Sequence, residues 1–380
     1  MPLHPPSPIL HPRRLLVRGV NWLGDAVMTT PALLRLREAM PDTHITLLTP
    51  EKLKDLWRGH PAVDEALAVP ADTKLWTLGA LLRARRFDVA LVLPNSPRSA
   101  LEIWLARIPR RIGYARPWRN WLLTDLVAER PGRVKMHKRS NEEIRQLLTR
   151  PAASASLLPA SAHQIHDYLH LTAVLGARTK ALPPQLAVSA TDIASVAQKF
   201  GLAPGATWLG INPGAEYGPA KRWPPEFFVE TAVAVQARTG CRCVVFGGRG
   251  DAALAADITQ GLAAQSAAAP PPVNLAGQTS LRELCAALPL CRVLLTNDTG
   301  PMHVAAALGV PVVVPFGSTS PELTGPGLPG VGEHSFLRGG APCAPCFRRE
   351  CPVDFRCLKR LSPERVTSAL LEVWAARNPV

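Results

Sequence analysis

The feature that most constrains the fold of this 380-residue chain is an alternation of strand-like and helix-like segments that occurs twice. In the first half, strands are predicted at 13–20, 44–50 and 87–94, and helices at 24–40 and 166–177. In the second half, strands are predicted at 207–214, 241–248, 293–296 and 310–316, and helices at 224–240, 280–291 and 362–377. Strands that alternate with helices favour parallel, doubly wound sheets, so we expect two α/β domains.

The length also favours two domains, because 380 residues exceed what one hydrophobic core usually organises. A Pro-, Ala- and Ser-rich segment at 150–164 interrupts the alternation, and the boundary is expected near 181–192. We therefore predict domains at 1–185 and 186–360, followed by a C-terminal helix within 361–380. Doubly wound sheets bind ligands at the carboxyl ends of their strands, so the two domains are expected to face each other across a cleft.

Composition indicates a soluble, globular protein, with 47% apolar and 19% charged residues. The longest apolar stretches, such as 304–316, are too short to span a bilayer. The N-terminal sequence MPLHPPSPILHPRR lacks the apolar core of a signal peptide, so we interpret it as a short disordered lead. A cytoplasmic location is expected.

The net charge of +14 is concentrated in the first half of the chain. Residues 1–180 carry a net charge of +12, whereas residues 181–380 carry +2. Such an excess attracts anionic partners, namely nucleic acid, an acidic membrane or a phosphorylated or carboxylated substrate; the alternative is a merely solubilising surface. Nucleic acid is disfavoured because the chain lacks a helix-turn-helix, finger or aromatic RNA-binding motif.

The segment TNDTGPMHVAAALGVPVVVPFG, residues 296–317, predicts a strand, a tight turn, a helix and a second strand. The free N–H groups at the start of such a helix favour a bound anion. Asp298 is therefore unexpected there, and it is either a ligand for a polar group or a simple helix cap. His303 falls one turn along the helix, where it reaches a ligand or serves as a core or capping histidine.

A second motif, PGAEYGPAKRWPPEFF at 213–228, places a Gly- and Pro-rich loop and a cation between a strand and a helix. This arrangement leaves Lys221 free to approach a diphosphate and to stabilise negative charge on a leaving group. The alternative is an exposed basic pair, Lys221 and Arg222, before Trp223. The sequence contains no Asp-x-Asp pair, which favours a mechanism that needs no metal.

Four segments in order, WLGDAVMTTPAL, VLPNSPRSAL, PGAEYGPAKRWP and NDTGPMHVAAALGVP, resemble the lipopolysaccharide heptosyltransferases of glycosyltransferase family 9. The resemblance extends over residues 13–375. It implies a GT-B fold of two Rossmann-like domains, with the acceptor on the first and ADP-heptose on the second. In GT-B proteins the last helix often crosses back onto the first domain, so such a crossing is one expectation for the helix within 361–380. It also implies inverting transfer of L-glycero-D-manno-heptose to the first heptose of the inner core; the alternatives are transfer to Kdo of Kdo2-lipid A or to another acceptor.

The resemblance further implies roles for individual residues. The donor-binding residues would be Glu216, Tyr217, Lys221, Thr279, Asp298, Thr299, Gly300 and His303, and Glu216 and Tyr217 are those associated with addition of the second heptose. Asp298 would bind sugar hydroxyls. Asp25 would be the catalytic base, although a first-turn helix-dipole complement is its simplest structural role. Lys221 would stabilise the departing ADP, and no metal or cofactor beyond the substrate ADP-heptose is expected.

The acceptor would explain the positive charge, because inner-core lipopolysaccharide carries carboxylates and phosphates. The expected acceptor-binding residues are Asn21, Asn95, Arg98, Arg119 and Lys138. They belong to a wider basic cluster that also contains Arg110, Arg111, Arg116, Lys135, His137 and Arg139. The stretch 113–125 interleaves arginine with Trp118 and Trp121, which suits contact with sugars or lipid headgroups and predicts peripheral contact with the inner membrane.

Four of the eight cysteines have a C-x2-C-x4-C-x5-C spacing, namely Cys343, Cys346, Cys351 and Cys357. Disulfides are disfavoured in a cytoplasmic protein, so a structural metal is one interpretation and reduced thiols are the other. The remaining cysteines, Cys241, Cys243, Cys285 and Cys291, lie in predicted core elements.

Overall fold

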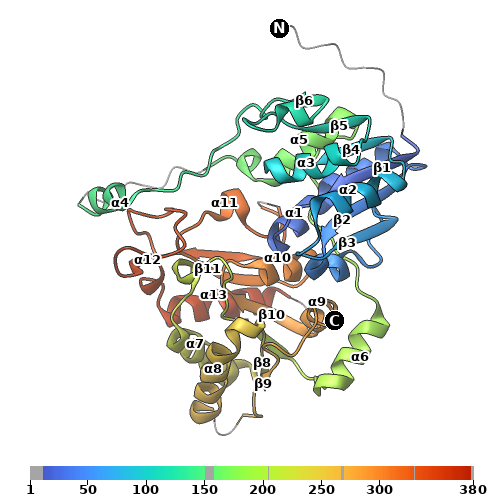
Figure 1. The fold of residues 1–380 in the computed structure, drawn as a ribbon. Helices are drawn as coiled ribbons and strands as arrows, with labels where there is room; N and C mark the ends of the chain where they lie inside the picture. Colours follow the sequence, from blue (N-terminus) through green and yellow to red (C-terminus); the bar gives the residue numbers. More distant parts are fainter. Residues whose placement is uncertain (1–11, 150–157, 204, 267–268, 329, 378–380) are drawn as a thin grey trace. The chain divides into compact units, whose positions relative to one another are not determined.

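The computed structural model describes residues 12–149, 158–203, 205–266, 269–328 and 330–377 (Figure 1). The chain divides into two compact units: unit 1 comprises residues 1–133 and 161–187, and unit 2 comprises 134–160 and 188–380. The division after Ala187 lies close to the boundary expected after residue 185, but residues 134–160 join unit 2. The predicted disordered lead at 1–11 and residues 150–157 of the Pro-, Ala- and Ser-rich segment lie outside the described residues.

Unit 1 is built on six parallel strands in the order β3-β2-β1-β4-β5-β6. They are β1 (Arg14–Arg18), β2 (His44–Pro50), β3 (Glu65–Val69), β4 (Val89–Val92), β5 (Arg110–Tyr114) and β6 (Asp125–Val127). The three central residues of β1 and all four residues of β4 are apolar and buried, as expected of strands covered on both faces. The predicted strands at 13–20, 44–50 and 87–94 are confirmed.

The helices of unit 1 cover both faces of this sheet. They are α1 (Leu23–Ala39), α2 (Leu75–Ala84), α3 (Pro97–Leu105) and α5 (Ile165–Thr172). Right-handed crossovers in opposite directions along the sheet place α1 on one face and α2 and α3 on the other. Accordingly, α5 packs on α1, and α2 packs on α3.

Helix α1 continues through Pro31, which cannot donate a hydrogen bond to the carbonyl group of Val27 one turn earlier. The hydroxyl group of Thr30 donates to that carbonyl oxygen at 2.8 Å. The buried carbonyl is therefore satisfied, and the helix reaches Ala39.

Unit 2 repeats the topology of unit 1, with six parallel strands in the order β9-β8-β7-β10-β11-β12. They are β7 (Trp208–Asn212), β8 (Arg242–Val245), β9 (Val273–Asn274), β10 (Cys291–Thr296), β11 (Val312–Phe316) and β12 (Ser335–Arg338). All four strands predicted for the second half are confirmed. The adjacent strands β7 and β10 occupy the same position as β1 and β4 in unit 1.

The helices of unit 2 are α4 (Asn141–Leu148), α6 (Ala190–Phe200), α7 (Pro225–Thr239), α8 (Ala252–Gln265), α9 (Leu281–Ala287), α10 (Gly300–Ala307), α11 (Pro321–Thr324), α12 (Arg356–Lys359) and α13 (Pro363–Ala376). Helix α13 packs on α7 and on β10, β11 and β12, and it buries Leu370 in the core. The C-terminal helix, for which we considered a crossing back to the first domain, therefore belongs to unit 2. Ile144 of α4 joins the same core.

Candidate active site

The predicted donor-binding residues of unit 2 follow the carboxyl ends of neighbouring strands. Lys221 follows β7, Asp298 and Thr299 follow β10, and Thr279 follows β9. Parallel strands bring these ends to one edge of the sheet, and the strand order reverses between β7 and β10. Such a switch point is where doubly wound sheets bind ligands.

Lys221 and Asp298 form an ion pair at this edge, with 2.7 Å between Nζ and Oδ2. Only 13% of the Lys221 side chain and 5% of the Asp298 side chain are exposed. The hydroxyl group of Thr319 donates a hydrogen bond to the same Asp298 oxygen. The structure thus brings together two predicted site residues that are far apart in sequence, and it adds a third that sequence analysis missed.

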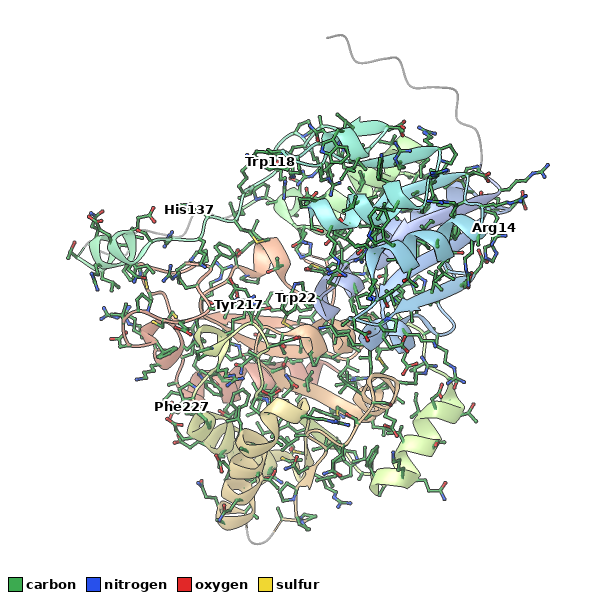
Figure 2. The ribbon with its side chains drawn as sticks, viewed as in Figure 1. Arg14, Trp22, Trp118, His137, Tyr217 and Phe227 are labelled. Atoms are coloured by element: carbon green, nitrogen blue, oxygen red, sulfur yellow. The ribbon has the colours of Figure 1, made fainter. Side chains whose placement is uncertain are left out.

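The aromatic ring of Tyr217, which is labelled in Figure 2, lies against Lys221 of this pair. Its ring centroid is 4.8 Å from Lys221 Nζ and 5.2 Å from the Arg349 guanidinium. The Tyr217 hydroxyl group donates to the carbonyl oxygen of Phe347 at 2.8 Å. Two cations over one ring, close to a buried carboxylate, form an electropositive surface suited to a diphosphate.

Asn297 connects the two donor motifs and was also missed by sequence analysis. Its Oδ1 accepts a hydrogen bond from the Trp223 backbone N–H at 3.0 Å, and its Nδ2 donates to the Pro213 carbonyl at 2.6 Å. The side chain is completely buried. The loop after β7 is therefore fixed to the loop after β10, which positions Lys221 relative to Asp298.

The simple helix cap considered for Asp298 is not what the structure contains, because Thr299 is the N-cap of α10. The Asp298 side chain turns to Lys221 and Thr319 instead. Gly300 begins the helix, and His303 is buried within it. The N-terminus of α10 therefore lies at the carboxyl edge of the sheet. The Asp298 carboxylate lies next to it but does not cap the helix.

The two remaining predicted donor-binding residues lie on other loops. Glu216 is exposed on the loop after β7, and Thr279 is half-buried before the Ser280 cap of α9.

In unit 1, Asp25 lies half-buried in the first turn of α1, directly after β1. Its negative charge, together with burial as the larger cause, raises the pKa of Tyr168 on α5. The two groups are therefore close, and Tyr168 also accepts a hydrogen bond from Gln164 at 2.8 Å. Asp25 thus occupies the switch point of this sheet, between β1 and β4.

A buried carboxylate links two of the predicted acceptor-binding residues. Glu102, whose side chain is 4% exposed, contacts Arg18 at 2.8 Å and Arg98 at 3.3 Å. Arg18 also donates to the Asn21 side-chain oxygen at 3.1 Å. Asn21 and Arg98 therefore belong to one polar network, and Asn95 is exposed on the loop after β4.

Arg119 differs from its expected role, because its side chain is completely buried. It donates to the Pro94 carbonyl, while its Nε and a second terminal nitrogen have no hydrogen-bond partner among the described residues. Burial, and to a lesser extent the charge of Arg116, lowers the pKa of Arg119 to about 10. A β-carbon on Gly113 would lie 2.5 Å from the guanidinium, so any larger residue there would displace the Arg119 side chain. In this position Arg119 supports the sheet edge from inside and does not offer a surface contact.

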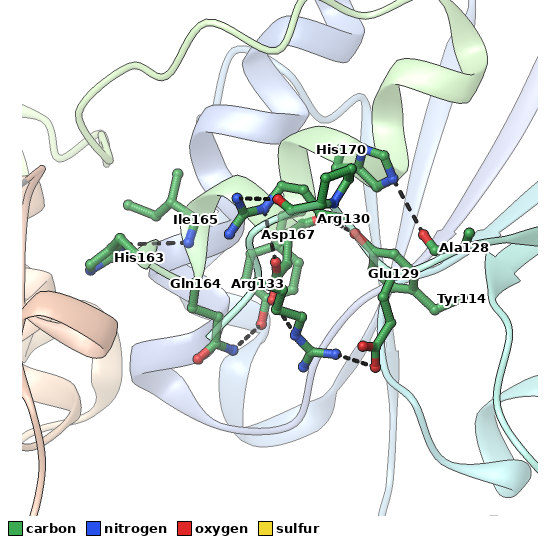
Figure 3. Close-up of polar contacts among 12 residues, drawn as sticks. Tyr114, Ala128, Glu129, Arg130, Arg133, His163, Gln164, Ile165, Asp167 and His170 are labelled. Carbon is green, nitrogen blue, oxygen red and sulfur yellow. Dashed lines mark hydrogen bonds and ion pairs between the residues drawn. The ribbon is translucent and has the colours of Figure 1, made fainter. Parts of the chain in front are cut away.

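Most other members of the basic cluster are paired within the chain. Arg110 contacts Asp125 at 3.0 Å, and Arg116 contacts Glu129 at 2.9 Å. Figure 3 shows a related network around Asp167, which contacts Arg130 at 3.2 Å and Arg133 at 3.0 Å. Lys138 is exposed, but it lies in the segment that joins unit 2. These ion pairs neutralise part of the positive charge of the first half, and the net charge of +12 over residues 1–180 remains.

The cysteine motif forms no evident metal site. Within the described residues, no three or more His, Cys, Asp or Glu side chains are grouped so as to hold a metal ion. All eight cysteines are described, and all are free thiols. Burial is the largest cause of the raised pKa values of Cys343 and Cys346, so these thiols are protonated at neutral pH. The structure describes the four cysteines of this motif as free thiols, and a structural metal stays an untested prediction.

Comparison with known proteins decides the family. The family model described as glycosyltransferase family 9 (heptosyltransferase) matches residues 136–355, more than half of the chain. The chain belongs to glycosyltransferase family 9. The lipopolysaccharide heptosyltransferase 2 of Salmonella typhimurium is 32% identical to this glycosyltransferase over 319 residues, which cover 82% of this chain and 85% of the relative.

A solved structure and a second sequence relative agree with this membership. The structure of E. coli ADP-heptose LPS heptosyltransferase II matches this glycosyltransferase with a TM-score of 0.74 and 29% identity, over 96% of this chain and 99% of that chain. The lipopolysaccharide heptosyltransferase 1 of Pseudomonas aeruginosa is 26% identical, over 94% of this chain and 97% of that one. The fold of this glycosyltransferase is GT-B, which confirms the predicted class. None of the helices in its described ranges is long and apolar enough to cross a bilayer.

Proposed function

We propose that this glycosyltransferase transfers L-glycero-D-manno-heptose from ADP-heptose to the first heptose of the lipopolysaccharide inner core, with inversion at the anomeric carbon. Family membership and the heptosyltransferase 2 relatives support the reaction class. The observation that carries the proposal is the buried Lys221–Asp298 pair at the switch point of unit 2. The pair places a cation, which suits the diphosphate of a nucleotide sugar, beside a carboxylate, which suits the hydroxyl groups of the sugar.

In the donor site, the Lys221 ammonium group would stabilise the negative charge that builds on the departing ADP. An ammonium group has three donors, so Lys221 can contact a phosphate oxygen while it keeps its bond to Asp298. The Thr299, Gly300 and α10 amides would hold the diphosphate, with His303 one turn along the helix. Asp298 would accept hydrogen bonds from the heptose hydroxyls, and Glu216, Tyr217 and Thr279 would complete the pocket. No metal or cofactor is required by this scheme.

In the acceptor site, Asp25 would remove the proton from the attacking hydroxyl group as that group bonds to the anomeric carbon. The bond between the anomeric carbon and the ADP oxygen breaks in the same displacement, which inverts the configuration. Asn21, Asn95 and Arg98 would orient the acceptor, and the exposed Lys138 is a further proposed acceptor contact. Arg119 does not contact the acceptor in this proposal, because its side chain is buried.

We also propose that the enzyme works in the cytoplasm, in peripheral contact with the inner membrane. Support comes from three tryptophans of unit 1: Trp118 is 87% exposed, Trp121 is 67% exposed and Trp104 is 41% exposed. Trp118 is labelled in Figure 2. Trp104 and Trp121 form an edge-to-face pair 5.9 Å apart. Trp118 has a left-handed backbone with φ of 68°, which is unfavourable for a bulky residue. Exposed indole rings beside arginine suit the interface of an anionic bilayer.

The deciding experiment is a turnover assay with ADP-heptose and two acceptors, one carrying Kdo alone and one already carrying the first heptose. The proposal predicts product with the mono-heptosylated acceptor. Turnover with the Kdo-only acceptor alone would instead assign transfer of the first heptose, the alternative reaction. Lack of turnover with both acceptors would refute the proposed reaction.

A further inference from the structure

A loop that begins at the last residue of the 296–317 motif and continues beyond it closes a ring of contacts around Lys221 and Asp298. This loop, residues 317–320, follows β11, which lies next to β10 in the sheet. The Ser318 carbonyl accepts a hydrogen bond from the Phe347 N–H at 2.7 Å, and the Phe347 carbonyl accepts one from Tyr217. Tyr217 in turn lies against Lys221, which is paired with Asp298. The loop is therefore held by the same residues that line the donor site.

Close packing keeps this loop next to Lys221. A β-carbon on Gly317 would lie 2.7 Å from the Leu358 side chain and 3.1 Å from the Ala220 carbonyl oxygen. Only glycine allows the loop to approach the residue that precedes Lys221. This packing fixes the position of the loop and therefore of Thr319, which is 8% exposed.

We propose that Thr319 is a positioning residue of the donor site, which acts through Asp298. The Thr319 hydroxyl group and the Lys221 ammonium group both contact Asp298 Oδ2. No hydrogen bond to Oδ1 is found among the described residues, so this second oxygen remains for a ligand. Two donors on one oxygen fix the rotation of the carboxylate and direct its other oxygen away from both.

Without the threonine hydroxyl group, nothing in this ring opposes rotation of the Asp298 carboxylate, and both of its oxygens could share the Lys221 ammonium group. That arrangement would withdraw Oδ1 from the sugar and would hold the ammonium group away from the diphosphate. Thr319 therefore keeps Asp298 Oδ1 available to the sugar and the Lys221 ammonium group available to the diphosphate of the same nucleotide sugar. This inference rests on the proposed function of the donor site.

The test compares Thr319→Val, which removes the hydroxyl group at nearly equal volume, with Thr319→Ser, which keeps it. We expect kcat/KM for ADP-heptose to fall about ten- to hundredfold in Thr319→Val, the value of one hydrogen bond to a charged group. Thr319→Ser should stay within about threefold of wild type. The matched control is Thr324→Val, because within the described residues the hydroxyl group of Thr324 hydrogen-bonds only to the Ser320 carbonyl, at 3.4 Å. This control should behave as wild type.

A double-mutant cycle distinguishes positioning from general damage to the fold. If Thr319 acts through Asp298, Thr319→Val should cause no further loss in an Asp298→Ala background. Calorimetry with ADP should also show weaker binding to Thr319→Val than to wild type. Wild-type kcat/KM and ADP affinity in Thr319→Val, or a loss that persists in the Asp298→Ala background, would overturn the inference. Absence of turnover in the wild-type enzyme, with ADP binding still weakened by Thr319→Val, would refute the proposed function alone.

Discussion

Lys221 Nζ lies 2.7 Å from Asp298 Oδ2, and both side chains are largely withdrawn from water. Removal of one partner from such a pair leaves a buried charge without compensation. Lys221→Gln should therefore lower the free energy of unfolding by about 3 kcal/mol. It should also lower kcat by about 10²- to 10³-fold, because the charge on the leaving group loses its stabilising cation. Denaturant titration and steady-state kinetics measure the two effects.

The neighbouring Arg222 provides the control for this prediction. Its side chain is 41% exposed and lies 3.4 Å from Asp251, outside the ring around Asp298. Arg222→Gln should leave kcat within about twofold of wild type. A Lys221→Gln enzyme that is as active as Arg222→Gln would contradict the role given to Lys221.

Replacement of Asp25 by Asn preserves the shape of the side chain but removes its ability to accept a proton. We expect kcat to fall by about 10²- to 10⁴-fold, while the dissociation constant of ADP-heptose is unchanged. Kinetics and calorimetry on the same preparation separate the two quantities. Glu38→Gln, at the opposite end of α1 and paired with Arg35, is the matched control. Substantial turnover by Asp25→Asn would exclude Asp25 as the base.

Asn297→Ala should destabilise unit 2 and weaken donor binding together. The change leaves the Trp223 N–H and the Pro213 carbonyl without their buried partner. We expect a loss of about 2–4 kcal/mol in the free energy of unfolding and a raised KM for ADP-heptose, because the loop that carries Lys221 is released. Unfolding of the variant at the wild-type denaturant concentration would show that this amide does not join the two loops.

His60 should make stability depend on pH below neutrality. Burial lowers the pKa of His60 to about 4 from 6.5, and its Nδ1 accepts a hydrogen bond from the Ala62 N–H at 3.2 Å. The unfolded chain therefore binds the proton first, so this stabilisation is complete above pH 6.5 and is lost progressively between pH 6.5 and pH 4. The loss should reach about 3 kcal/mol, and burial lowers the pKa of His334 in the same direction.

Denaturant titrations at pH 7 and pH 5 test this dependence. In His60→Gln the difference in unfolding free energy between the two pH values should shrink, because the group that titrates has been removed. An equal difference in variant and wild type would show that other groups cause it.

The exposed tryptophans should govern binding to lipid. Trp118→Ala combined with Trp121→Ala should reduce partitioning to phosphatidylcholine vesicles that contain phosphatidylglycerol by about tenfold or more, since two large apolar side chains are lost. Sedimentation with the vesicles and the blue shift of tryptophan fluorescence measure the binding. Val353→Ala, an exposed apolar residue of unit 2, is the control. Wild-type partitioning by the double variant would remove the support for membrane contact.

Central strands and long helices could be predicted from the sequence because their burial leaves continuous apolar runs. Strands β3, β5, β6, β9 and β12 escaped prediction. All residues of β3 are only half-buried, and β9 contains two residues, so neither produces a clear pattern. Helix α5 ends at Thr172, before the predicted end at 177. The next residues, Ala173–Leu175, form a 3-10 turn, and Gly176 then adopts a left-handed backbone that ends it.

At the candidate site, motifs identified Lys221 and Asp298 because their chemistry is unusual at those positions. Asn297 and Thr319 gave no comparable signal, since an amide or a hydroxyl group becomes informative only when its spatial neighbours are known. Arg119 is the opposite case, a residue that the sequence predicted at the site and that the structure buries. Its place among tryptophans and arginines resembled a surface, but the neighbouring Gly113 leaves room for the side chain inside the fold.

The chain passes from unit 1 to unit 2 after Arg133, returns after Ala160 and leaves again after Ala187. Ile144, made early, belongs to a core whose other members are all made after residue 200. On the ribosome, α4 must therefore wait for its partners, because residues 161–187 of unit 1 are made before them. A shortened protein beginning at Val188 would lack that side chain, so dissection of the enzyme at its apparent linker would leave a gap in the second half.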